Sequence, residues 1–171
     1  DFSSFFVSSA ICTGYTTAGH ALFQITIPGQ SAATSACWVL DVGTGQWSRR
    51  ESSGVPYYRG LLAVNALSHV YITDAHTGTL YTMDESTYLE GTEEMPFEVI
   101  STHLLNDGDR LTVNSIQIDM ETGRGQSSGT GSNPRGLLSV SKDGGKTWCM
   151  HRMVNLGKIG EYRTRAQEHR F

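Results

Sequence analysis

The chain has 171 residues, of which 38% are apolar and 18% charged, and its formal net charge is −4. This length suits a single domain with a buried core. The acidic balance argues against a protein that coats nucleic acid. No apolar run approaches the roughly 18 residues needed to cross a membrane. Its 19 glycines predict many tight turns and little helix.

Short stretches rich in β-branched and aromatic residues follow one another along the chain. The first, "HALFQITIP" at 20–28, alternates in part with a period of two, as a strand does. The others are 36–42, 60–67, 69–74, 96–105, 110–120 and 136–143. Turn-forming residues bound nearly all of them. We therefore predict an all-β protein built of antiparallel hairpins.

Three of the predicted turns share one spacing, in which an Asp is followed by Thr-Gly at the third and fourth positions. The pairs are Asp41 with Gly45, Asp74 with Gly78, and Asp119 with Gly123. The Asp carboxylate can accept hydrogen bonds from the turn, and Gly can adopt the positive φ that such turns require. Each pair is therefore predicted to form a hairpin turn.

A fourth turn lies in "SVSKDGGKTW", residues 139–148. It matches the Asp-box pattern S-x-D-x-G-x-T-W at Ser141, Asp143, Gly145, Thr147 and Trp148. This pattern is best known from sialidases, where it recurs on the outer hairpins of propeller blades and stabilises a turn away from the catalytic centre. We interpret it as a structural motif that indicates a hairpin, not a reaction.

The turns recur at spacings of 33 residues, from Asp41 to Asp74, and 45 residues, from Asp74 to Asp119. Both are near the repeat length of propeller blades, so we predict a β-propeller or a portion of one. Residues 1–171 are expected to form a single all-β domain. Because the chain lacks an initiator Met, we expect it to be part of a longer protein.

The three cysteines, Cys12, Cys37 and Cys149, are far apart and odd in number. This does not indicate a disulfide framework and favours assembly in a reducing cytoplasm.

Charge is unevenly distributed. Residues 60–109 contain nine acidic residues and no Lys or Arg, whereas residues 135–171 contain eight basic residues and three acidic ones. The two segments are either solvated faces or surfaces by which copies of the chain pack against each other or touch phosphate. The candidate interface residues are Arg152, Lys158, Arg163 and Arg165. Arg163 and Arg165 would share one face if their segment is a strand.

The sequence offers no recognisable active site. A sialidase would need an arginine trio, a Tyr nucleophile with a Glu partner, and an acid/base carboxyl group. The chain has ten Arg and seven Tyr, so these residue types are present, but it has only one clear Asp box. The six histidines show no metal-ligand spacing, and there is no phosphate-binding Gly-rich loop or nucleophile elbow. We therefore expect no enzyme activity, no metal and no cofactor.

Several segments together resemble the packaged-DNA stabilisation proteins, also called head-completion or tail-hub proteins, of short-tailed bacteriophages. They are "GHALFQITIPG", "CWVLDVGTGQWSRRES", "HVYITDAHTGTLYTMDESTY" and "GSNPRGLLSVSKDGGKTW" followed by "LGKIGEYRTR". The resemblance extends from about Gly19 to Arg165, whereas "AQEHRF" at the end departs from the family pattern. The family is larger than this chain, so the chain would be its C-terminal portion.

The resemblance implies a propeller-based virion protein of the phage tail that forms a ring, closes the portal channel after packaging and retains the DNA. Its partners would be copies of itself, portal or adaptor proteins, and the tail needle and tailspikes, with direct DNA contact left open and no membrane. Two other functions remain open at this point. One is a sialidase-like glycosidase, and the other is a propeller that binds carbohydrate or protein without catalysis.

Overall fold

The computed structural model describes residues 7–31, 34–84, 87–104, 107 and 111–169. The chain divides into two compact units, residues 1–99 (unit 1) and 100–171 (unit 2). The predicted all-β fold is confirmed. The helical segments in the described ranges are two single 3₁₀ turns, η1 (Val7–Ser9) and η2 (Thr130–Ser132). In these ranges no helix has the length and apolar character to span a membrane.

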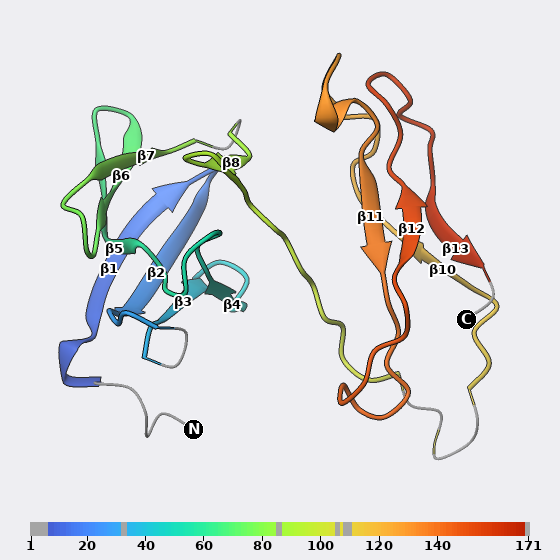
Figure 1. Cartoon of the computed structure of the whole chain (residues 1–171), viewed down its shortest axis with the longest axis horizontal. Helices are drawn as coiled ribbons and strands as arrows, with labels where there is room; N and C mark the ends of the chain where they lie inside the picture. The colour runs from blue at the N-terminus through green and yellow to red at the C-terminus, as the bar shows by residue number, and fades with distance from the viewer. Residues whose placement is uncertain (1–6, 32–33, 85–86, 105–106, 108–110, 170–171) are drawn as a thin grey trace. The chain divides into compact units, whose positions relative to one another are not determined.

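Unit 1 begins with a four-stranded antiparallel sheet in which each strand pairs with the next along the chain. Its strands are β1 (Ile11–Thr17), β2 (His20–Ile27), β3 (Ala36–Asp41) and β4 (Trp47–Arg50), and β1 and β2 are its longest (Figure 1). The register places Gln24 of β2 opposite Thr13 of β1 and Val39 of β3. Because side chains alternate along a strand, these three residues lie on one face of the sheet.

A second antiparallel sheet of unit 1 contains β5 (Gly60–Ala66), β6 (His69–Asp74) and β7 (Leu80–Met83), in that order. A short hairpin of β8 (Leu89–Glu90) and β9 (Glu93–Glu94) follows. The register between β5 and β6 shifts between Gly60 and Ala63, which marks a β-bulge. In both sheets each strand pairs with the next strand along the chain, so both are simple meanders.

The two meanders pack together through an apolar cluster. Tyr15 of the first sheet lies buried against Ala63, Val70 and Ile72 of the second. Hydrogen bonds join the sheets beside this cluster, because the side-chain amide of Asn65 donates to the Thr16 carbonyl and accepts from the Thr16 N–H, both at 2.8 Å. The inner faces of the two sheets thus form the core of unit 1.

Part of this core is polar. Gln24, Thr26 and Cys37 are fully buried on the inner face of the first sheet. The Arg50 guanidinium lies over the Tyr15 ring, 5.7 Å from its centroid. Burial raises the pKa of the Cys37 thiol to about 11, against the lowering effects of the Thr26 hydroxyl and Arg50. Cys37 is therefore a protonated, packed thiol at neutral pH.

Unit 2 is built from two antiparallel strand pairs. β10 (Ser115–Ile118) pairs with β13 (Ala166–His169), and β11 (Arg135–Leu138) pairs with β12 (Arg152–Asn155). The Arg152 guanidinium connects the pairs, because it donates to the His169 carbonyl at 3.0 Å and lies 3.3 Å from the Glu168 carboxylate. Val154 and Ala166 are the buried apolar residues of these strands.

Three predicted strands differ from the structure, and the one at 136–143 is a strand only as far as Leu138. Residues 96–104 are exposed and belong to no strand formed among the described residues, and residue 105 lies outside those residues. Of the predicted strand at 110–120, only Ser115–Ile118 is a strand, and residue 110 is not described. A β-prone composition is insufficient for a strand, because the backbone also needs a neighbour with which to form hydrogen bonds.

Candidate functional site: the Asp turns and the basic segment

The Asp41 turn connects β3 and β4. The Asp41 carboxylate accepts from the Gly43 N–H at 2.9 Å, and its other oxygen lies 2.8 Å from His20 Nδ1. Gly45 has a φ of 71° and donates to the Asp41 carbonyl at 2.8 Å. Partial desolvation would raise the pKa of Asp41, but hydrogen bonds from Thr44, Gly43 and His20 hold it below its usual value. The carboxylate thus acts as the cap of the turn.

The Asp74 turn repeats this arrangement between β6 and β7. The buried Asp74 carboxylate accepts from the N–H groups of His76 and Thr77 at 2.7 and 2.8 Å. Gly78 has a φ of 69°. Desolvation opposes ionisation, but the hydrogen bonds from His76 and Thr77 outweigh it and lower the pKa of Asp74. Two hairpins of unit 1 therefore use the same turn chemistry.

Asp119 and Gly123 do not follow the pattern. The strand before Asp119 pairs with β13, so no return strand follows Gly123 to form a hairpin. Gly123 has a φ of 78°, and its N–H donates to the Leu156 carbonyl at 3.0 Å while its carbonyl accepts from the Gly160 N–H at 3.1 Å. The expected hairpin turn is therefore a junction between two loops. The shared D-x-x-T-G spacing alone could not distinguish the two.

The Asp box lies in the connection between β11 and β12. The Asp143 carboxylate accepts from the N–H and the hydroxyl of Thr147, at 2.8 and 2.5 Å, and from the Ser141 hydroxyl at 2.8 Å. The Ser141 hydroxyl oxygen also accepts from the Gly145 N–H at 2.8 Å. Bonds from Thr147, then Ser141, lower the pKa of Asp143 to about 2. Trp148 follows this network and is 46% exposed.

The basic candidate residues have different surroundings. Arg152 is held by Glu168 and His169 within unit 2. Lys158, Arg163 and Arg165 are exposed, and in the described ranges none of them forms an ion pair. Arg163 and Arg165 precede β13, in a turn and the residue leading into the strand, so the strand geometry expected to align them is absent.

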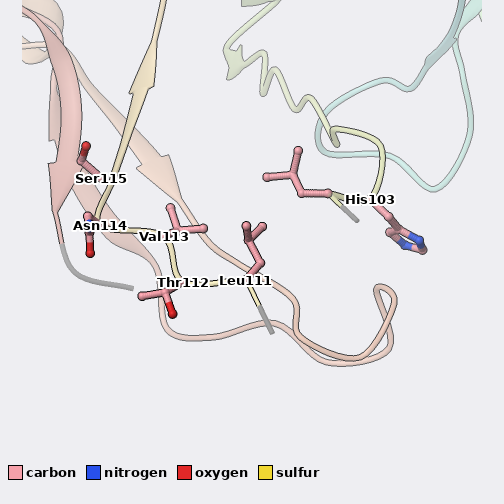
Figure 2. Close-up of a pocket in the computed structure, with 7 residues that line it drawn as sticks. His103, Leu111, Thr112, Val113, Asn114 and Ser115 are labelled. Carbon is pink, nitrogen blue, oxygen red and sulfur yellow. The ribbon is translucent and has the colours of Figure 1, made fainter. Parts of the chain in front are cut away.

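Described residues of unit 2 line at least two open surface hollows. The larger, of about 780 Å³, is lined by His103, Leu104 and residues 111–115. Figure 2 shows the His103 imidazole directed away from Leu111 and Val113. The smaller, of about 320 Å³, lies beside the Asp box and includes Lys142, Cys149 and Arg152. In the described part of the chain, no three His, Cys, Asp or Glu side chains gather to hold a metal.

Sequence patterns missed the polar interior of unit 1. The Arg50 guanidinium lies beside Tyr15, and burial raises the pKa of both Tyr15 and Tyr58 although the charge of Arg50 opposes it. Arg50 stands in the polar run 48–53, and this composition gives no sign of partial burial. One signal of its position is its partner in the sheet, because Arg50 of β4 lies opposite the buried Cys37 of β3.

Comparison with known proteins gives one match. Residues 96–171, fewer than half of the chain, match the family described as bacteriophage P22 Gp10, beta-sandwich. No curated protein and no solved structure matches the chain. The match supports a structural protein of a bacteriophage virion, in its tail, that assembles with other virion proteins. It is consistent with a protein that is not an enzyme.

The match also corrects the predicted fold class. A β-sandwich agrees with the antiparallel strand pairs of unit 2 but does not fit a closed propeller. The propeller prediction therefore does not extend to residues 96–171, although they contain the Asp box. The physical reason is that an Asp box specifies a local network around one carboxylate, and such a hairpin can connect strands in more than one β architecture.

Proposed function

We propose that this chain is a structural protein of a short phage tail that closes the portal channel, retains packaged DNA and forms a platform for further tail parts. The family match over residues 96–171 carries the proposal, because it connects this chain to a bacteriophage structural domain. The head-completion role rests on a resemblance, because the segments from Gly19 to Arg165 resemble those of head-completion proteins in order and spacing.

The proposed partners are copies of the chain in a ring, the portal or adaptor proteins, the tail needle and the tailspikes. Lys158, Arg163 and Arg165 are exposed and form no ion pair with another described residue, which suits contacts with acidic protein surfaces or with DNA phosphate. Three unpaired cysteines suit assembly in the host cytoplasm before the virion is released.

For unit 1 we propose a propeller-type arrangement. Its two meander sheets stack face to face, as neighbouring blades of a propeller do. The Asp turns at Asp41 and Asp74 occupy equivalent places, between the last two strands of each meander. The proposed protein thus joins blade-like sheets in unit 1 to a sandwich in unit 2.

The test is co-sedimentation of the protein with DNA-filled phage heads that lack tails, with DNA release measured in the same samples. Binding that stops DNA release supports the proposal. Heads that neither bind the protein nor retain their DNA better in its presence contradict the proposed role.

Charge reversal of Arg163 and Arg165 tests the basic segment. We expect Arg163→Glu with Arg165→Glu to weaken head binding about tenfold or more while leaving the melting temperature nearly unchanged, because exposed charges contribute little to folding. Lys142→Glu with Lys146→Glu is the matched control, since it reverses two cations elsewhere in unit 2. Unchanged binding with a lowered melting temperature would assign the two arginines to folding instead.

A further inference from the structure

Unit 1 carries an exposed segment that is strongly acidic. Residues 93–99, called the acidic segment, contain no Lys or Arg, and all of them are exposed. Its acidic residues are Glu93, Glu94 and Glu98. None of these three carboxylates forms an ion pair with another described residue. Because Phe97 and Val99 are 91% and 74% exposed, the segment offers negative charge and apolar surface together.

The base of the acidic segment is held on unit 1. The Glu90 carboxylate, in the same β8–β9 hairpin, accepts from the Ser52 hydroxyl at 2.7 Å and from the Ser53 N–H at 3.1 Å. A Cβ on Gly54 would lie 2.9 Å from Cγ of Glu93, so β9 lies against the same stretch of chain. A segment anchored in this way loses less conformational freedom on binding than a free tail would lose.

Unit 2 carries an exposed segment of the opposite charge. Residues 158–165, called the basic loop, lie in the connection between β12 and β13. Its cations, all exposed and without an ion pair to another described residue, are Lys158, Arg163 and Arg165. The carboxylate of Glu161, the one acidic residue of the loop, accepts from the Lys158 N–H at 2.9 Å. Ile159 and Tyr162 are 58% and 68% exposed, so this loop also combines charge with apolar surface.

Hydrogen bonds within unit 2 fix the shape of the basic loop. The Gly160 N–H donates to the Gly123 carbonyl, and the Thr164 N–H donates to the Glu161 carbonyl, both at 3.1 Å. The Thr122 hydroxyl donates to the Thr164 carbonyl at 3.0 Å. The loop therefore presents its side chains on a preformed backbone, which lowers the entropy cost of binding a partner.

The acidic segment and the basic loop complement each other. Three carboxylates match three cations, and such complementarity steers association and selects the partner. Exposed ion pairs by themselves contribute little free energy. Phe97 and Tyr162 supply the apolar part of the contact, because aromatic residues and Arg are enriched at the cores of protein interfaces. Charge thus selects the contact, and burial of the aromatic side chains stabilises it.

A second copy of the chain is the partner that carries the matching charge. Two acidic segments repel each other, and so do two basic loops, whereas every copy carries one segment of each kind. We propose that the acidic segment of one copy binds the basic loop of a second copy. Repetition of this contact produces a ring or a filament. The inference deepens the proposed ring of copies by naming its contact residues, and it rests on the proposed function for its biological setting.

The test is a charge swap in the full chain, read by sedimentation velocity over a micromolar concentration series at low salt. The acidic-segment variant carries Glu93→Lys, Glu94→Lys and Glu98→Lys, and the basic-loop variant carries Lys158→Glu, Arg163→Glu and Arg165→Glu. We expect each variant alone to self-associate about tenfold or more weakly than the wild type, because each brings like charges together. An equimolar mixture of the two should associate like the wild type, because every contact between unlike variants again joins opposite charges.

Lys142→Glu with Lys146→Glu is the matched control, since it reverses two exposed cations of unit 2 outside the basic loop. It should associate like the wild type. Circular dichroism and melting temperature verify folding, and Phe97→Ser and Tyr162→Ser, which disable the apolar part of the contact, replace a charge variant that does not fold. Either replacement should also weaken self-association.

A wild-type chain that stays monomeric at every concentration overturns the inference, because the two segments then bind within one chain or not at all. A mixture that stays as weak as its components overturns it too, since charge pairing between the segments is then not what joins the copies. Equal weakening by the control would mean unspecific attraction. A monomeric chain that seals phage heads would remove this inference alone, whereas a chain that self-associates without sealing heads would remove the proposed function alone.

Discussion

The Asp143 carboxylate illustrates how one side chain organises a turn. It accepts from the N–H of Lys146 and from both donors of Thr147, although it is exposed. An exposed ion usually gains little from its neighbours. Here several donors of one short loop point at the same carboxylate, and this convergence favours the ionised form.

We expect Asp143 to titrate with a midpoint of about 2 in the folded protein, measured from its carboxyl ¹³C shift by NMR. Because its folded pKa lies below the unfolded value of about 3.9, the turn contributes to stability above that pH and loses its contribution as the pH falls toward the folded value. Asp143→Asn should remove the titration. A midpoint near the unfolded value would mean that the Thr147 and Ser141 hydrogen bonds do not persist in solution.

Gly123 carries a steric requirement that its sequence motif did not reveal. A Cβ on Gly123 would lie 2.9 Å from the carbonyl carbon of Glu161 and from the N of Tyr162. Backbone atoms at that distance cannot move aside as a flexible side chain can. We expect Gly123→Ala to lower the free energy of unfolding by about 2–4 kcal/mol, from left-handed backbone strain and overpacking together.

Gly145→Ala is the control for Gly123→Ala in urea unfolding. Gly145 also has a positive φ, of 86°, but a Cβ there would meet nothing within 4 Å. Its cost should therefore be the strain alone, about 1 kcal/mol. Equal losses for the two variants would show that the loop junction at Gly123 is not formed.

At the scale of elements, one side chain between the two sheets of unit 1 forms the hydrogen bonds that a backbone would form. The Asn65 amide makes both hydrogen bonds that a neighbouring strand would make to Thr16. Thr13 adds a bond from its hydroxyl to the Ala63 carbonyl. These bonds fix how β1 lies along β5, which apolar packing alone would leave free to slide.

We expect Asn65→Ala to destabilise unit 1 by about 1 kcal/mol and to speed hydrogen exchange at the Thr16 N–H, which loses its acceptor. Asn65→Asp should preserve the acceptor and lose the donor, so Thr16 exchange should be slower in Asn65→Asp than in Asn65→Ala. Unchanged Thr16 protection in Asn65→Ala would mean that the bridge between the sheets does not form.

At the scale of the whole molecule, the two units differ in the surfaces they offer. Unit 1 offers the exposed carboxylates of the acidic segment, and unit 2 offers the exposed cations of the basic loop. Contacts between copies through these segments should weaken as salt screens their charges. The acidic-segment variant leaves Arg163 and Arg165 in place, so the variants of the two units separate loss of self-association from loss of these cations.

The sequence by itself determined that the protein is all-β, because β-prone stretches separated by turn residues leave little freedom in the choice of element. It also located the Asp turns at Asp41, Asp74 and Asp143, since each depends on residues within a few positions. Only the tertiary structure decided the pairing of β10 with β13, the loop junction at Gly123 and the half-buried position of Arg50 beside Tyr15. These depend on partners far away in the chain, and a local pattern contains no information about which distant backbone will lie beside it.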